Sequence, residues 1–268
     1  MWTALLALPL VLSAGDGVPV RVDLRIELLT LVFRLIEANE YKQPGASSPY
    51  SREADLYFEP ARDHEVCRLA RKLRAQHGIG FDAVPSLAVH LSAPPELALR
   101  VPLEPWPERL EGRWKEVDLD AFLRALRAFA EETEFLEFEK TFAETQRAAE
   151  QSLAKQIEAA SVLPWLHGFF GLEAGTSYVA IPGLFCGPGN YGVSVRLADG
   201  TLELWPVIGA GEWDAEGRPV YGPGHVGTVV HEFTHAFANP VVDANWSALA
   251  PPFERLFPSV KDVMAQQA

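Results

Sequence analysis

The chain has 268 residues, of which 48% are hydrophobic and 22% charged. This composition excludes a disordered chain, which is poorer in apolar residues, and a collagen-like chain, which is far richer in glycine and proline. The 36 acidic and 23 basic residues give a net charge of −13. That charge argues against a nucleic-acid partner, because phosphate backbones are bound by clustered lysine and arginine. Two cysteines, Cys67 and Cys186, exclude zinc fingers built on Cys-x-x-Cys pairs and leave one disulfide open.

Residues 1–15, MWTALLALPLVLSAG, are typical of a secretory signal peptide. The apolar run from Met1 to Leu12 is too short to span a bilayer, which takes about 20 residues. Small residues follow for cleavage, although no lysine or arginine precedes the run. The alternative is a buried N-terminal strand or helix. No later segment is apolar enough to cross a membrane, so we expect a secreted or periplasmic protein without a membrane span.

A helical N-terminal part is predicted for residues 16–160, and a catalytic part for residues 161–268. The run 22–38 is apolar almost all round, which predicts a buried helix. Gly78 is placed as the C-cap of an amphipathic helix. The carboxylates around Phe135 indicate a solvated helix face. The helices are expected over 22–38, 61–77, 81–92 and 118–160, with loops over 39–60 and 94–107.

The pattern then changes from a helical period to a period of two. A strand is predicted over residues 176–182, and two more over 191–197 and 201–208. Asp199-Gly200 lies between the last two runs and predicts an antiparallel hairpin. Pro206 indicates a sheet edge or the end of a strand. A glycine-rich loop, residues 209–224, leads into the next helix.

That helix contains the sequence TVVHEFTHAF, in which His231, Glu232 and His235 spell H-E-x-x-H. Positions i and i+4 of a helix lie one above the other, so both imidazoles can bind one ion. Glu232 lies about 100° round the helix from His231 and can reach a water on the metal. Zn²⁺ lowers the pKa of that water, and the carboxylate takes its proton as the water attacks a carbonyl. The motif predicts zinc ligands at His231 and His235 and a general base at Glu232.

The alternative for these residues is a structural helix whose histidines hydrogen-bond the core. A zinc site of this type also needs a third protein ligand. Glu254, 19 residues beyond His235, lies at the start of an apparent helix, close to the gluzincin spacing. A surface carboxylate favoured by the helix dipole explains Glu254 equally well. No histidine follows His235, which excludes the three-histidine metzincin pattern.

Three segments carry a resemblance to a known family: HEFTHAFANP, residues 22–41 and residues 81–92. They resemble a family of secreted bacterial proteins classified as domain of unknown function 4932, over nearly the whole chain from Val22. The resemblance implies a zinc-peptidase-like fold, with ligands at His231 and His235 and a catalytic carboxylate at Glu232. It also implies that relatives continue beyond Gln267 into a helix with another glutamate. The chain is then expected to be incomplete, with the third ligand lost by truncation, unless Glu254 is that ligand.

Four further features lie near the motif. His225 is interpreted as a polar residue at the helix entry in preference to a transition-state donor. Tyr191 and Tyr221 are interpreted as packing aromatics in preference to oxyanion donors. Asn239-Pro240 is expected to end the helix, because proline cannot continue it.

The sequence therefore predicts an α+β, zincin-like fold, mostly helical, with an antiparallel hairpin before the H-E-x-x-H helix. We expect a secreted zinc metallopeptidase that hydrolyses a peptide or protein substrate, with the hairpin edge pairing with extended peptide. The alternative is a catalytically inactive, peptidase-like module that binds peptide. A third reading is a structural protein in which the motif is accidental. The sequence makes no prediction of the oligomeric state.

Overall fold

The structure, a computed structural model, describes residues 17–42, 48–171 and 175–261. The predicted signal peptide lies outside the described residues. The helices are α1 (Leu24–Leu35), α2 (Pro49–Tyr57), α3 (Glu65–His77), α4 (Ala83–Val89), α5 (Leu119–Glu132), α6 (Phe135–Thr141), α7 (Ala143–Ala160), α8 (Val162–Phe170), α9 (Gly224–Ala244) and α10 (Trp246–Leu256). The strands are β1 (Thr176–Tyr178), β2 (Ile181–Gly183), β3 (Tyr191–Arg196) and β4 (Leu202–Gly209).

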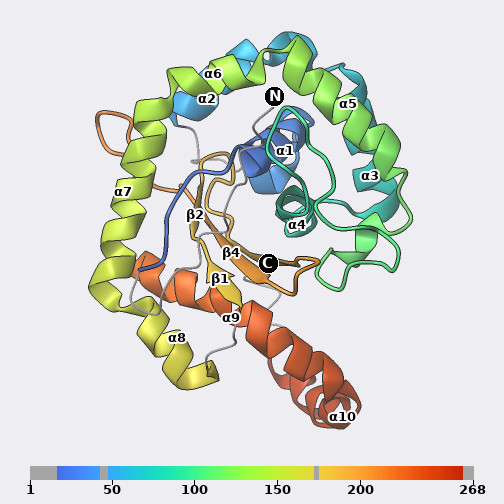
Figure 1. The fold of residues 1–268 in the computed structure, drawn as a ribbon, viewed down its shortest axis with the longest axis vertical. Helices are drawn as coiled ribbons and strands as arrows, with labels where there is room; N and C mark the ends of the chain where they lie inside the picture. The colour runs from blue at the N-terminus through green and yellow to red at the C-terminus, as the bar shows by residue number, and fades with distance from the viewer. Residues whose placement is uncertain (1–16, 43–47, 172–174, 262–268) are drawn as a thin grey trace, which may run out of the picture.

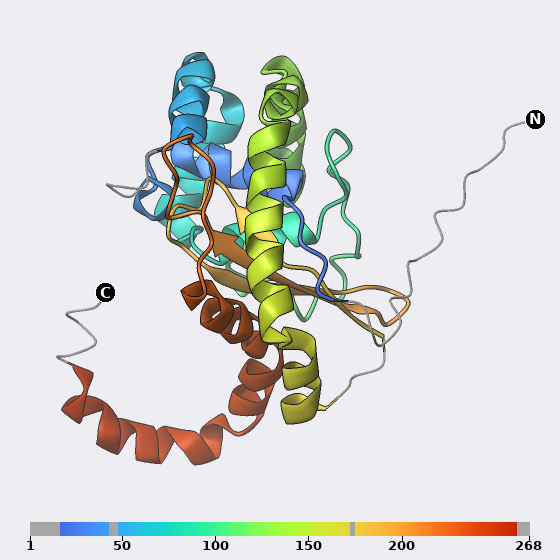
Figure 2. The ribbon, with the colours of Figure 1, turned by 90° about the vertical axis from the view of Figure 1, so that its left-hand side faces the viewer.

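Four of the helices form a curved wall around the sheet. Figure 1 shows α3, α5, α6 and α7 arranged in an arc that encloses α1, α4 and the strands. Helix α9 crosses below the sheet, and α10 projects away from the body, as Figure 2 shows from the side. The fold is therefore a mixture of helix and sheet, as the α+β prediction requires.

Helix α1 lies at the centre of the core and confirms the buried helix predicted for residues 22–38. Asp23 caps its start by accepting a hydrogen bond from the backbone of Arg25. Its two arginines are buried and paired: Arg25 with Asp23 at 2.6 Å, and Arg34 with Asp55 at 2.6 Å. Burial of these charges is tolerated because each guanidinium meets a carboxylate.

Two parts of the helical prediction are wrong. Residues 39–60 are not all loop, because α2 occupies Pro49–Tyr57. Ser48 and Ser51 form a capping box around a proline at the first helical position, where a missing N–H costs nothing. The expected run over 118–160 is divided into α5, α6 and α7, with a left-handed residue, Glu134, at the first break (φ 52°). The predicted C-cap at Gly78 is confirmed by its φ of 65°.

The carboxylates around Phe135 do not all face solvent. Glu139 on α6 is only 2% exposed. It accepts hydrogen bonds from the hydroxyl of Tyr50 at 2.8 Å and from the side-chain amide of Gln146 at 2.7 Å. The hydroxyl of Tyr50 also lies 3.4 Å from a carboxylate oxygen of Glu27. Two buried acids from α1 and α6 thus meet at one tyrosine.

The sheet is mixed and has β4 at its centre. β3 pairs antiparallel with β4, with Tyr191 opposite Val207 and Arg196 opposite Leu202. β1 and β2 both pair parallel with β4 on its other side, a pairing that the sequence analysis did not predict. The expectation that Pro206 marks an edge or strand end is wrong. Pro206 falls between the stretches of β4 that pair with β1 and with β2, where its missing N–H interrupts no ladder.

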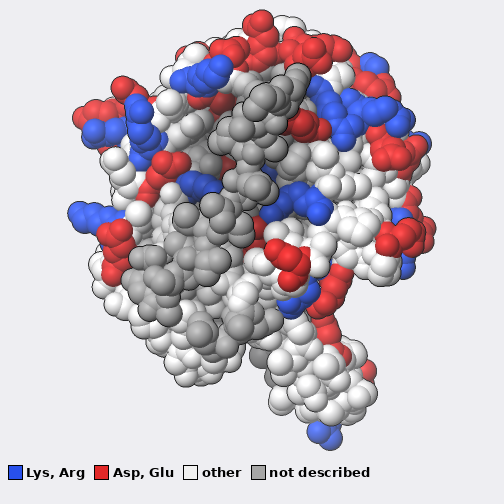
Figure 3. Space-filling view, viewed as in Figure 1, with Lys and Arg blue, Asp and Glu red and all other residues white. Residues whose placement is uncertain are grey.

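Helix α10 begins earlier than the apparent helix in the sequence and contains Pro251 and Pro252. None of its residues is buried, and Trp246 and Leu256 are 50% and 66% exposed. Figure 3 shows charged side chains along the rim of the body, whereas the projecting end of the chain is mostly uncharged on this face. Glu254 lies on this exposed helix.

Two further expectations concern the described residues. None of the helices in residues 17–42, 48–171 and 175–261 is long and apolar enough to cross a membrane. Cys67 and Cys186 are both buried and free, so the disulfide that the sequence left open is not formed.

Candidate metal site

Helix α9 is held against the sheet by one apolar face. Val229 and Phe233, four residues apart, are buried under β3 and β4. Phe233 meets the ring of Tyr178 edge-on, and Phe237 stacks on Phe170 of α8 with centroids 4.8 Å apart. Because these contacts fix the rotation of the helix, they also fix where the neighbouring H-E-x-x-H side chains point.

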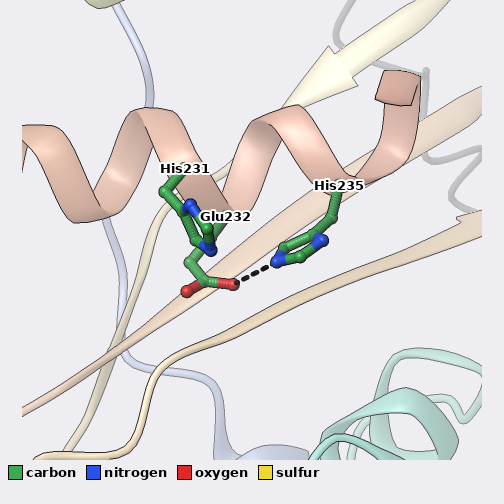
Figure 4. Close-up of side chains that lie close together, drawn as sticks. All are labelled: His231, Glu232 and His235. Atoms are coloured by element: carbon green, nitrogen blue, oxygen red, sulfur yellow. Dashed lines mark ion pairs between the residues drawn. The ribbon is translucent and has the colours of Figure 1, made fainter. Parts of the chain in front are cut away.

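The structure brings the three predicted site residues together. One ligand atom from each of His231, Glu232 and His235 lies within 4.8 Å of the others. The imidazoles of the two histidines lie edge to face with centroids 4.7 Å apart. Nε2 of His235 is 3.8 Å from Oε2 of Glu232, and Figure 4 shows these two groups turned toward one another. No other group of three such side chains is found in the described part of the chain.

Glu232 is the buried member of the group, at 7% exposure. Its turn of α9 packs directly on β3 at Gly192, where a Cβ would collide with the carbonyl oxygen of Glu232 and lie 3.1 Å from the Cβ of His235. Burial raises the pKa of the Glu232 carboxyl above its ordinary value, while the two imidazoles and a backbone hydrogen bond from Gly192 lower it in part. A raised pKa makes the ionised carboxylate a stronger base.

The two imidazoles fit two of the three protein ligands of a catalytic zinc site. Imidazole nitrogens bind Zn²⁺ at about 2.1 Å, so two of them in a tetrahedral site lie about 3.4 Å apart. The present atoms lie within 4.8 Å of one another. His231 is exposed and the side chain of His235 is 40% exposed. Both imidazoles are exposed enough to rotate toward this separation.

Helix α9 does not end at Asn239-Pro240, contrary to the prediction. Helix α9 continues to Ala244 with Pro240 inside it. Proline offers no N–H to the carbonyl of Ala236, and Nη1 of Arg109 donates to that carbonyl instead, at 3.2 Å. The side chain of Asn239 faces His235, with Oδ1 3.2 Å from Nδ1 of the imidazole.

The remaining candidates lie outside the group. His225 accepts a hydrogen bond from the backbone of Gly222 at 3.0 Å, as expected of a residue at the helix entry. Tyr191 and Tyr221 are buried, and the Tyr221 hydroxyl donates to the carbonyl of Ile208 at 3.1 Å, so both serve packing. Glu254 is not part of the group.

A family model described as Domain of unknown function (DUF4932) matches residues 20–261. The chain belongs to this family. No curated protein and no solved structure matches this chain. The family description states no activity, so the function has to be argued from the site.

Proposed function

We propose that the protein is a zinc metallopeptidase of the gluzincin-like type, with a zincin-like arrangement of its hairpin and metal-bearing helix. The observation that carries this proposal is the convergence of His231, Glu232 and His235 within 4.8 Å on one turn of α9. His231 and His235 would hold the ion. When bound, Zn²⁺ supplies a Lewis acid that lowers the pKa of a water and polarises a carbonyl.

Glu232 is the residue that moves protons. Its carboxylate takes a proton from the attacking water while the water oxygen forms a bond to the peptide carbonyl carbon. It then returns the proton to the amine nitrogen as the C–N bond breaks. Burial raises the pKa of this carboxyl, which strengthens it as the base of the first step.

Strand β3 is the element that would bind substrate. Among the described residues it pairs with β4 alone, so its other edge has no strand partner. It lies directly beside the site, since Gly192 contacts the Glu232 turn. An extended peptide added to this edge would form main-chain hydrogen bonds and pass next to the metal-bearing helix.

The test is peptide hydrolysis by the zinc-loaded protein, followed by mass spectrometry on a mixed peptide library. Glu232→Gln is expected to bind zinc as the wild type does and to lose hydrolysis. H225A is the matched control, because His225 lies on the same helix and is engaged with Gly222. Cleavage by E232Q at the wild-type rate would exclude the proposed mechanism.

A second candidate function is a peptidase-like module that binds peptide without cleaving it. One observation favours it. Within residues 17–42, 48–171 and 175–261, no further carboxylate or imidazole joins His231, Glu232 and His235 as a third metal ligand. Peptide binding without any hydrolysis, unchanged in E232Q, would support this candidate. Export from the cytoplasm is part of both proposals and rests on the sequence of residues 1–15.

A further inference from the structure

The two histidines of the site are held differently. The residue four positions after His231 is His235 itself, which meets it edge-on. The residue four positions after His235 is Asn239, whose Oδ1 lies 3.2 Å from Nδ1 of the imidazole. Asn239 thus places a side-chain oxygen within hydrogen-bonding distance of His235, whereas the equivalent position for His231 holds an imidazole.

This contact favours one tautomer of His235. An amide oxygen only accepts hydrogen bonds, so the contact is a hydrogen bond when Nδ1 carries the proton. In a neutral imidazole, Nε2 then keeps its lone pair. Oε2 of Glu232 lies 3.8 Å from Nε2, too far for a hydrogen bond. Nε2 is thus left free and faces the centre of the group.

The backbone around Asn239 is held as well. Pro240 leaves the carbonyl of Ala236 without its helical donor, and Arg109, from the loop before α5, donates to it. The turn that carries both His235 and Asn239 therefore stays helical, which keeps the i and i+4 side chains on one face.

We propose that Asn239 is a positioning residue that holds His235 in the tautomer with a free Nε2, ready to bind a metal ion. The inference deepens the proposed function and rests on it, since the ion concerned is the zinc of that site. Partners of this kind orient ligand histidines and raise their basicity, and their loss costs about 10- to 100-fold in metal affinity.

The first measurement needs no metal. Two-bond ¹H–¹⁵N correlation spectra of the metal-free protein report the protonated nitrogen of each histidine, and H235A assigns the signal of His235. Wild type is expected to show the Nδ1–H tautomer at His235. N239A should lose that preference, and N239D, which keeps an acceptor oxygen, should retain it. The control D243A removes another exposed side chain of α9, one turn further along, and should behave as wild type.

The second measurement is zinc affinity by competition with a chromogenic chelator. N239A is expected to bind zinc about 10- to 100-fold more weakly, and N239D as tightly as wild type. An unchanged tautomer or an unchanged zinc affinity in N239A would overturn the inference. A wild type that binds no zinc would instead remove the proposed function, and the tautomer of metal-free N239A would then decide the role of Asn239 alone.

Discussion

The buried carboxyl of Glu139 is expected to make the stability of the fold depend on pH, and E139Q to remove that dependence. Glu139 accepts its hydrogen bonds from two neutral groups, the Tyr50 hydroxyl and the Gln146 amide. Burial raises its pKa from the ordinary 4.5 to about 7. The pKa of Glu27, on the other side of Tyr50, is also raised, by burial and by the charge of Glu139. The folded protein therefore binds protons more tightly here than the unfolded chain does.

The size of the effect follows from the shift. One pKa unit is worth about 1.4 kcal/mol, so the full shift at Glu139 corresponds to about 3 kcal/mol. Because the pKa is raised in the folded state, this contribution is fully present below the unfolded value and is lost as the pH rises through about 7. Between about pH 5 and pH 8.5, the wild type should therefore lose about 2 to 3 kcal/mol of unfolding free energy that E139Q does not lose.

Urea unfolding followed by tryptophan fluorescence measures this difference at each pH. E137Q is the matched control, because Glu137 lies two residues away on α6 with an exposed side chain. Its unfolding free energy should follow that of wild type across the pH range. A difference between E139Q and wild type that stays constant with pH would refute the reasoning.

Three further outcomes are expected. G192A should destabilise the protein by at least about 2 kcal/mol in urea unfolding, because its Cβ collides with the Glu232 turn. In contrast, G227A on α9, where a Cβ meets nothing within 4 Å, should stabilise by up to about 1 kcal/mol; equal effects would contradict the close packing. E254A should leave zinc affinity unchanged, since Glu254 is exposed outside the group; a loss as large as that of H235A would assign it as a ligand. Removal of zinc with a chelator should abolish hydrolysis and leave the far-ultraviolet spectrum unchanged, because α9 is held by apolar contacts.

Features encoded by neighbouring residues could be predicted from the sequence. The buried helix α1, the C-cap at Gly78 and the hairpin around Asp199-Gly200 each depend on a local pattern. The H-E-x-x-H group is of the same kind, because helical spacing alone brings His231 and His235 together.

Three of the errors share a cause, which is proline. Pro49, Pro206 and Pro240 indicated a loop, a strand end and a helix end. Pro49 instead occupies the first turn of α2, where its missing N–H is not needed. Pro206 lies in the gap between two partner strands, and Arg109 serves the carbonyl that Pro240 leaves open. The compensation at Pro206 and Pro240 comes from distant parts of the chain and is not visible in a local pattern.

Two residues of the site were missed for different reasons. Gly192 matters because β3 lies against α9, a tertiary contact that no spacing reveals. Asn239 did carry a local signal, since it follows His235 by four residues. The expectation that the helix ends at Asn239-Pro240 concealed it, because i and i+4 side chains meet only where the helix continues.

The most direct test of the account is zinc stoichiometry and affinity of the purified 268-residue chain, by equilibrium competition against a chromogenic chelator. We predict one zinc ion per chain, lost in H231A and in H235A and retained in E232Q. No bound zinc, or zinc that persists unchanged in both histidine variants, would contradict the assignment of this site.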